Sequence, residues 1–160
     1  MITISEATEN DAQELLKIKI RSFAWDVDKY GMGPPNYDSL EHLINSIEKA
    51  FYYKITFEGL LIGGFSLYEK GNLHFELGSL YIDPDYQNRR IGAKVIEYIE
   101  KKYSDIIKWS LYTPYLSFRN QHFYEKMGYI KVEEIRIEEY KGFTLFRYEK
   151  EFEIKGVLIK

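Results

Sequence analysis

The hydrophobic period of this chain changes at Ile82, and that change restricts the fold more than any other feature. Before it come three strand-like segments joined by two hairpin signals: residues 51–57, 60–69 and 72–82, with breaks at Glu58-Gly59 and Lys70-Gly71. After it, apolar residues recur at helical spacing from Ile91 to Lys102, and residues 106–112 are again strand-like. A strand, a helix and a strand in this order imply a right-handed crossover, so the two strands are predicted to lie parallel.

The N-terminal part is predicted to add a strand at residues 2–7 and two helices. Thr8 and Asp11 resemble a capping box at the start of the first helix. Its apolar face is predicted to hold Ala12, Leu16, Lys19 or Ile20, and Phe23. A Gly/Pro loop at 31–36 leads to the second helix, which Asp38 with Glu41 is predicted to cap.

The C-terminal part is predicted to hold a short helix and a closing hairpin. The helix covers residues 117–127 and ends at Gly128, a typical C-terminal cap. The hairpin strands are residues 129–140 and 143–154, with a turn at Lys141-Gly142. No repeat, low-complexity run or linker interrupts the 160 residues. We therefore expect one α/β domain over 1–160, with a mixed, mostly antiparallel sheet.

Composition argues against several functional classes. A net charge of −3 disfavours nucleic acid as a partner, because phosphate-backbone binding needs a basic face. The absence of cysteine excludes disulfides, thiolate metal sites and a cysteine nucleophile, and the three histidines lack metal-ligand spacing. No stretch approaches the roughly 18 apolar residues of a membrane-spanning helix, and the first residues lack a signal-peptide core. We expect a cytoplasmic protein that uses no metal, membrane or nucleic acid.

The connection at residues 83–93 is the first candidate site. The first turn of a helix leaves backbone N–H groups without partners, and with the helix dipole they form an anion site that suits a pyrophosphate. Gly92 would let a phosphate approach the backbone, and Asn88, Arg89 and Arg90 would add donors and positive charge. Alone, the pattern fits either a phosphate-binding loop or an ordinary strand–helix turn with a solvated basic edge.

The segment Gln87-Asn88-Arg89-Arg90-Ile91-Gly92-Ala93 resembles the pyrophosphate loop Q/R-x-x-G-x-G/A of the GCN5-related N-acetyltransferases (GNAT). The preceding residues 80–86 resemble the strand and turn that lead into that loop. The resemblance implies a GNAT fold with a central splayed parallel pair and helices on both faces, and acetyl-CoA as co-substrate. The implied cofactor contacts are Leu80, Tyr81 and Ile82 for pantetheine, and Gln87, Asn88, Arg89, Arg90, Ile91, Gly92 and Ala93 for the pyrophosphate.

Arg90 stands where the family pattern has its first glycine. We expect its backbone to be helical, its amide to serve the phosphates, and its side chain to reach solvent or a phosphate of CoA.

The segment Phe123-Tyr124-Glu125-Lys126-Met127-Gly128-Tyr129 matches a second GNAT signature, F-Y-E-K-x-G-F/Y. Most of it is expected to be structural, with Phe123 and Met127 in the core. The resemblance implies that Tyr124 acts as general acid for the departing thiolate, since a phenol of pKa near 10 stays protonated at neutral pH. The alternative is a half-buried tyrosine with a satisfied hydroxyl. Ser117 replaces an asparagine that often contacts the cofactor in the family, and Asn120 is the other candidate for that contact.

Glu76 is the first candidate for the general base, directly or through an ordered water, with a structural carboxylate as the alternative. Tyr112 stands near the position where some family members have a second glutamate, and a neutral phenol cannot replace it. His74 and His122 titrate in a useful range, but lone histidines are more often structural. A backbone N–H near Ile82 is the candidate oxyanion donor.

The predicted reaction is direct attack of a primary amine, on a small molecule or a peptide, on acetyl-CoA in a ternary complex. The acceptor is expected to contact the 140–143 hairpin and the first helix with its loop: Phe23, Trp25, Tyr30, Pro34, Pro35 and Tyr37. Two other functions stay open, a non-catalytic acyl-CoA-binding module and an unrelated α/β nucleotide-binding protein. A homodimer is an open alternative to a monomer.

Overall fold

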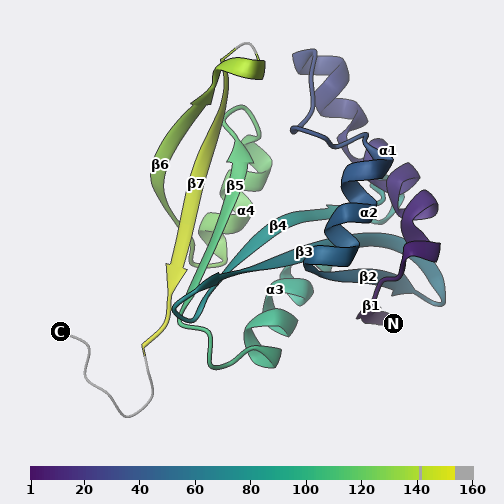
Figure 1. The fold of residues 1–160 in the computed structure, drawn as a ribbon, viewed down its shortest axis with the longest axis horizontal. Helices are drawn as coiled ribbons and strands as arrows, with labels where there is room; N and C mark the ends of the chain where they lie inside the picture. Colours follow the sequence, from purple (N-terminus) through teal and green to yellow (C-terminus); the bar gives the residue numbers. More distant parts are fainter. Residues whose placement is uncertain (141, 154–160) are drawn as a thin grey trace. The chain divides into compact units, whose positions relative to one another are not determined.

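The computed structural model describes residues 1–140 and 142–153, in which seven strands and four helices follow one another (Figure 1). The strands are β1 (Ile2–Glu6), β2 (Phe51–Phe57), β3 (Leu60–Gly71), β4 (His74–Ile82), β5 (Lys108–Pro114), β6 (Ile130–Ile137) and β7 (Phe143–Glu151). The helices are α1 (Ala12–Tyr30), α2 (Leu40–Lys49), α3 (Ile91–Lys102) and α4 (Phe118–Lys126). Single 3₁₀ turns lie at Glu9–Asp11, Pro84–Tyr86 and Glu138–Tyr140.

The chain forms two compact units, and β3 and β4 each run from one into the other. The first unit contains residues 1–68 and 78–92, and the second contains residues 69–77 and the chain from Ala93 onward. The strand order is β1-β2-β3-β4-β5-β7-β6. The prediction of one domain over 1–160 stays a prediction.

The predicted parallel pair is present, and its pairing is short. β4 and β5 pair in parallel only from His74 to Leu77 and from Lys108 to Leu111. β5 continues to Pro114 beside β7, while the rest of β4, Gly78–Ile82, is the last strand of the first unit. Within that unit this segment has a strand neighbour only on its β3 side. The prediction of a mixed, mostly antiparallel sheet with a splayed parallel pair is confirmed.

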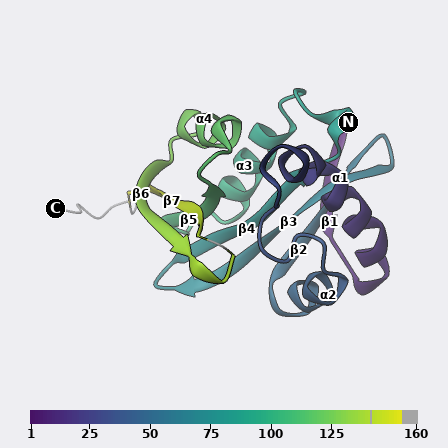
Figure 2. The same cartoon turned by 90° about the horizontal axis from the view of Figure 1, so that it is seen from above.

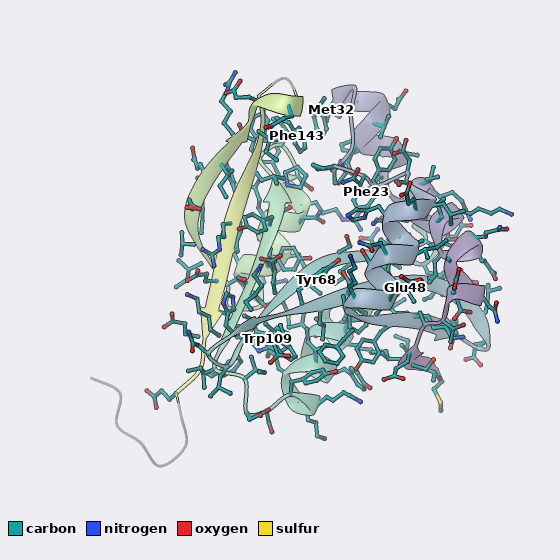
Figure 3. The ribbon with its side chains drawn as sticks, viewed as in Figure 1. Phe23, Met32, Glu48, Tyr68, Trp109 and Phe143 are labelled. Carbon is teal, nitrogen blue, oxygen red and sulfur yellow. The ribbon has the colours of Figure 1, made fainter. Side chains whose placement is uncertain are left out.

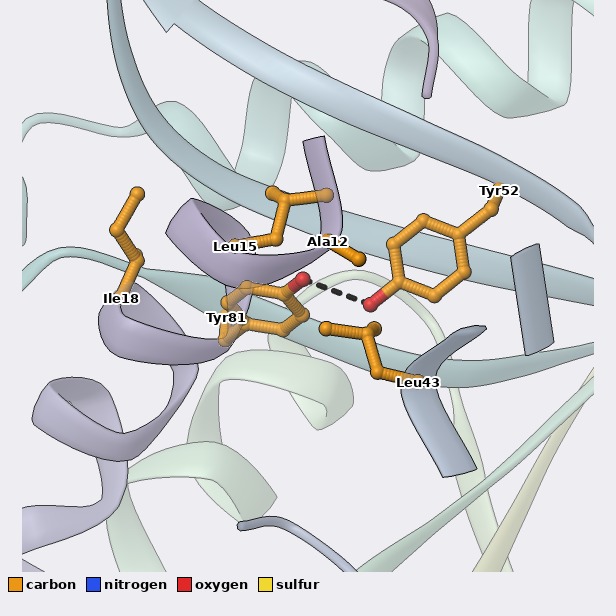
Figure 4. Packing of buried hydrophobic residues seen from close by; sticks show 6 residues of the cluster. All are labelled: Ala12, Leu15, Ile18, Leu43, Tyr52 and Tyr81. Atoms are coloured by element: carbon orange, nitrogen blue, oxygen red, sulfur yellow. Dashed lines mark hydrogen bonds between the residues drawn. The ribbon is translucent and has the colours of Figure 1, made fainter. Parts of the chain in front are cut away.

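In the first unit, both faces of β2 are buried. Tyr52 and Tyr53 are adjacent and therefore point to opposite faces, and both are buried. On one face Tyr52 joins a cluster shown in Figure 4: Ala12, Leu15, Ile18, Leu43, Tyr52 and Tyr81. Helix α1 supplies Ala12, Leu15 and Ile18 to this cluster, and helix α2 supplies Leu43. The two helices lie side by side in Figures 1 and 2. On the other face Tyr53 stacks on Phe65, with ring centroids 5.1 Å apart.

In the second unit, the core forms around Trp109 of β5, which is labelled in Figure 3. Its ring meets Phe75 of β4 edge-on at 5.6 Å and Tyr103 at 6.4 Å. Leu111 and Tyr148, from β5 and β7, are also fully buried. This packing fixes the parallel start of β4 against β5.

Several predicted boundaries and caps are wrong. The helix α2 is capped by Ser39 and not by Asp38, because Ser39 directly precedes the first helical residue and its Oγ accepts from the His42 N–H at 3.1 Å. The turn after β3 lies at Asn72 and Leu73, both at positive φ, and not at Lys70-Gly71, because β3 extends through Gly71.

The remaining elements appear as predicted, with shifted ends. Thr8 and Asp11 form the expected capping box, at the 3₁₀ turn that leads into α1. β5 covers 108–114 in place of the predicted 106–112, and β6 gives way to a 3₁₀ turn after Ile137. The predicted turn at Lys141-Gly142 and the predicted end of the last strand lie partly outside the described residues.

Candidate functional site

The end of β4 presents backbone groups on the edge that has no strand neighbour in the first unit. The Asp83 N–H donates to the Ile62 carbonyl oxygen at 2.7 Å, so residue 83 faces β3. Strand alternation then turns residue 81 to the same side, and a Cβ placed on Gly63 would collide with the Tyr81 carbonyl oxygen. The backbone groups of Leu80 and Ile82 consequently point to the opposite edge.

Tyr81 is less suited to the predicted cofactor contact than its two neighbours. Its backbone faces β3, and its hydroxyl shares a 2.7 Å hydrogen bond with the Tyr52 hydroxyl inside the core (Figure 4). Burial raises the pKa of both phenols above the ordinary range. We therefore leave Tyr81 out of the proposed cofactor contacts.

The turn after β4 is tied to α1 by an arginine that the sequence analysis did not single out. Arg21 Nη1 lies 2.8 Å from Asp83 Oδ2, and Nη2 lies 3.3 Å from Asp85 Oδ2. Asp83 is buried, and its other oxygen accepts from the Asp85 N–H at 2.9 Å. The Asp-Pro-Asp sequence signals a turn, but no local pattern names a partner 62 residues away.

The loop at 87–90 is held by its own side chains. Gln87 Nε2 donates to the Ile82 carbonyl oxygen at 3.0 Å, which closes the loop back onto the strand. The Arg89 guanidinium lies over the Tyr86 ring at 5.1 Å and the Phe57 ring at 5.9 Å. Gln87 and Arg89 therefore stabilise the conformation of the loop.

The prediction of a helical backbone at Arg90 is wrong. Arg90 has φ 61°, and Asn88 has φ 65°, so both are left-handed. The loop needs this conformation where the family pattern has glycine, and a non-glycine residue there costs roughly 1–2 kcal/mol. The Arg90 side chain is exposed, as expected, and α3 begins at the next residue, the buried Ile91.

Tyr124 lies on α4 in the second unit and is 8% exposed. Its ring meets Phe123 at 5.0 Å and Tyr129 at 5.8 Å. Burial raises its pKa above the ordinary range, so the phenol stays protonated at neutral pH. Gly128, which follows the helix at φ 96°, is the cap that the sequence predicts.

The other residues predicted around α4 lie at or near its start. Ser117 directly precedes α4, and its hydroxyl makes no capping hydrogen bond. Gln121 instead holds the approach to the helix, through Nε2 contacts to the carbonyl oxygens of Pro114 and Tyr115. Asn120 is half-buried and His122 is exposed. Ser117 and Asn120 both stay candidates for a cofactor contact.

Glu76 lies on the sheet face of the second unit that carries polar side chains. It pairs with Ser110 across β4 and β5, and burial raises its pKa, while Lys70 and Arg147 act in the opposite direction. Burial also raises the pKa of Tyr112, and the charge of Glu76 adds to that rise. A carboxylate with a raised pKa is a stronger base, which suits proton abstraction from an ammonium group.

His74 has a structural environment on the same face. Its Nε2 lies 2.7 Å from Ser110 Oγ, and burial and then Lys108 lower the pKa of the imidazole. It is therefore neutral at physiological pH and already hydrogen-bonded.

Residues 1–140 and 142–153 contain neither a cluster of metal ligands nor a membrane-spanning helix. No group of three or more His, Cys, Asp or Glu side chains is arranged to hold a metal ion. No helix in that part of the chain is long and apolar enough to cross a membrane.

The fold is similar to those of solved acetyltransferases. The PaiA N-acetyltransferase of Thermoplasma acidophilum, in complex with coenzyme A, aligns with a TM-score of 0.78 and 23% identity, over 95% of this chain and 99% of that one. The ribosomal-protein-S18-alanine N-acetyltransferase of Escherichia coli aligns with a TM-score of 0.71 and 16% identity, over 99% and 100% of the two chains. At these identities the likeness shows the fold alone.

Sequence comparison shows the family. Residues 41–131 match the Acetyltransferase (GNAT) domain. The chain is also 30% identical over 139 residues to a Bacillus subtilis (strain 168) protein, "Uncharacterized protein YrkN". This match covers 82% of this chain and 75% of the YrkN chain. The chain therefore belongs to the GNAT family and is an acyltransferase, and the alternative of an unrelated nucleotide-binding protein is wrong.

Proposed function

We propose that this GNAT protein transfers the acetyl group of acetyl-CoA to a primary amine by direct attack in a ternary complex. The observation that carries the proposal is the edge of β4 at Leu80 and Ile82, which has no strand neighbour in its unit and leads directly into the 87–92 loop. Pantetheine amides would pair with this edge as an added strand does. The pyrophosphate would then meet the amides of residues 88–93 at the start of α3.

The bond changes follow from the acceptor side. Glu76 takes one proton from the ammonium group, directly or through a water molecule, and the free amine nitrogen then attacks the thioester carbonyl carbon. The Ile82 N–H, on the edge that faces away from β3, stabilises the negative charge that develops on the carbonyl oxygen. The C–S bond breaks, Tyr124 gives its proton to the departing thiolate, and the nitrogen loses its second proton, which restores the Tyr124 phenol and completes the amide.

Tyr124 is proposed to act on the thiolate of CoA as it leaves. Because burial raises the pKa of this phenol, Tyr124 carries its proton at neutral pH and can act as general acid for the departing thiolate. Ser117 or Asn120, at the start of the same helix, would contact the cofactor.

A thermal-shift assay with acetyl-CoA, followed by thiol release with a panel of primary amines, tests the proposal. We expect acetyl-CoA to raise the melting temperature and at least one amine to release CoA. Stabilisation without turnover across all amines would favour the non-catalytic acyl-CoA-binding module. Stabilisation by ATP and none by acetyl-CoA would remove the cofactor assignment.

A further inference from the structure

Lys19 is a lysine on the buried face of α1. Only 6% of its surface is exposed, and it follows Ala12, Leu15 and Ile18 on the side of the helix that faces the core. Ile20, the other residue predicted at this turn of the apolar face, is 38% exposed. A buried ammonium group lowers stability unless an anion or several hydrogen-bond acceptors compensate for the lost water.

No such compensation comes from the described residues. Lys19 has no ion pair with any of them, and its Nζ makes no hydrogen bond to them. The side-chain atoms that are both fully enclosed and unpartnered in residues 1–140 and 142–153 are Trp109 Nε1, Thr113 Oγ1, Tyr129 Oη and Arg147 Nε. Lys19 Nζ is not among these atoms, so it is not sealed from solvent.

Among the described residues, the groups that interact with the ammonium group are an aromatic ring and an imidazole, and none of them is a carboxylate. Nζ lies 5.6 Å from the centroid of the Tyr81 ring, a weak cation–π contact. His42 on α2 is close enough that Lys19, after burial, lowers its pKa, so the imidazole is neutral at physiological pH. Neither Tyr81 nor the neutral His42 carries a negative charge that could neutralise the lysine.

Burial lowers the pKa of Lys19 to about 8, and no carboxylate offsets that effect. The group is therefore still mostly protonated at pH 7, but at a cost to the folded state. A bound anion would remove this cost and restore the ordinary charge of the lysine.

We propose that Lys19 binds a carboxylate group of the acceptor, so that the preferred substrate is an amine that also carries a carboxylate, such as an amino acid. This inference rests on the proposed acetyl transfer and names its substrate class. Lys19 contacts Tyr81, which lies between the two residues whose backbone forms the edge proposed for pantetheine. An anion at Lys19 would therefore lie one side chain from that strand and within the same unit.

Pairs of amines that differ only by the carboxylate test the proposal in the unaltered protein. Phenylalanine with phenethylamine, and lysine with cadaverine, are suitable pairs. We expect kcat/KM to be at least about tenfold higher for the amino acid of the better pair. Equal values, or a preference for the decarboxylated amine in both pairs, would overturn the proposal.

The Lys19→Met variant, with Lys17→Met as matched control, assigns the preference to this ammonium group. Lys17 lies two residues earlier on the exposed side of α1. We expect K19M to lose the preference for the amino acid, because its kcat/KM should fall at least about tenfold more for the amino acid than for the decarboxylated amine. K17M should behave like the parent protein. An equal loss on both members of a pair would make Lys19 merely structural and contradict the proposal.

A binding measurement separates this proposal from the acetyl-transfer proposal. The amino acid should raise the melting temperature of the CoA-bound parent protein and of K17M, and should leave K19M unchanged. Stabilisation by the amino acid alone, without turnover, would support the Lys19 site and count against the catalytic function. Turnover of amines without regard to the carboxylate would leave acetyl transfer in place and overturn the role of Lys19.

Discussion

Lys19 in the first unit and Lys150 in the second are both largely buried lysines that lie near an aromatic ring, but they differ in their charged partners. Lys150 Nζ lies 2.9 Å and 3.1 Å from the two carboxylate oxygens of Glu100 and donates to the Met127 carbonyl oxygen at 2.8 Å. Within residues 1–140 and 142–153, Lys19 has the face of Tyr81 and the neutral His42 near it, and no ion pair. Lys150 therefore stabilises the second unit, where it joins α3, the end of α4 and β7. The buried charge of Lys19 is expected to lower the stability of the first unit, a cost that is common at functional sites.

The same contrast separates two tyrosines and gives the largest expected effect. Tyr124→Phe should lower kcat by roughly 10²-fold or more, because the developing thiolate loses its hydrogen-bond donor. Tyr129→Phe is the matched control, since the Tyr129 hydroxyl is fully enclosed and has no partner among the described residues. Its removal should leave kcat unchanged and stability unchanged or raised. Thiol-release kinetics of both variants make the measurement, and equal losses would remove Tyr124 from the mechanism.

Glu76→Gln should follow, with a fall in kcat of about 10²-fold if Glu76 is the base. The raised pKa means that Glu76 must lose its proton before it acts, so the parent kcat/KM should rise with pH through that pKa, and E76Q should lack this limb. The folded state binds this proton more tightly than the unfolded chain does. The carboxylate therefore lowers stability above the folded pKa, and E76Q should be more stable than the parent protein at neutral pH but not at low pH. Chemical denaturation of both proteins at neutral and at low pH measures this difference. An E76Q variant that is less stable than the parent protein at neutral pH would contradict the prediction.

Lys150→Met should destabilise the protein by about 2–3 kcal/mol, because it leaves the Glu100 carboxylate without its partner. The side chains of the pair are 19% and 18% exposed, so the effect should be smaller than for a fully buried pair. Chemical denaturation at neutral pH measures it. A loss below about 0.5 kcal/mol would break the contrast between the two lysines.

Lys19→Met should have the opposite sign, a gain of roughly 1–3 kcal/mol at pH 7 without ligand. The pKa of Lys19 falls from 10.5 to about 8 on folding, so the unfolded chain binds more protons between these values. The parent protein should therefore gain stability from this group as pH rises from about 8 to 10.5. The advantage of K19M should shrink over the same range, with His42, Tyr52 and Tyr81 as the other titratable groups nearby. An advantage independent of pH would show that packing and not charge is responsible.

Arg90→Gly is expected to have the smallest effect. Glycine removes the strain of the left-handed backbone but adds entropy to the unfolded chain, so stability should change by less than about 1 kcal/mol. The affinity for CoA should fall no more than about threefold if the backbone amides carry the pyrophosphate. Titration of CoA against parent and variant makes the comparison. A much larger loss of affinity would assign the phosphate contact to the Arg90 side chain.

Local pattern was sufficient for much of the fold and for part of the candidate site. The alternation before Ile82 and the helical period after it predicted the parallel pair, because two strands joined by a helical crossover lie parallel when they pair. The apolar-face spacing of α1 placed Lys19 or Ile20 toward the core, but spacing could not choose between adjacent residues. Ser39 was missed as a cap since Asp38 beside it is an equally good cap by type.

The amino-acid sequence by itself determined the order of strands and helices, the family, and the positions of the loop and of the F-Y-E-K-M-G-Y motif. These follow from short-range periodicity and from residues adjacent in the chain. Tertiary structure decided what depends on distant partners. It made Arg90 left-handed and paired Arg21 with Asp83. It also buried Lys19 with no counter-ion among the described residues, while Lys150 pairs with Glu100, 50 residues away. The physical reason is that burial and pairing are properties of the folded surroundings, and no residue carries them in its own sequence context.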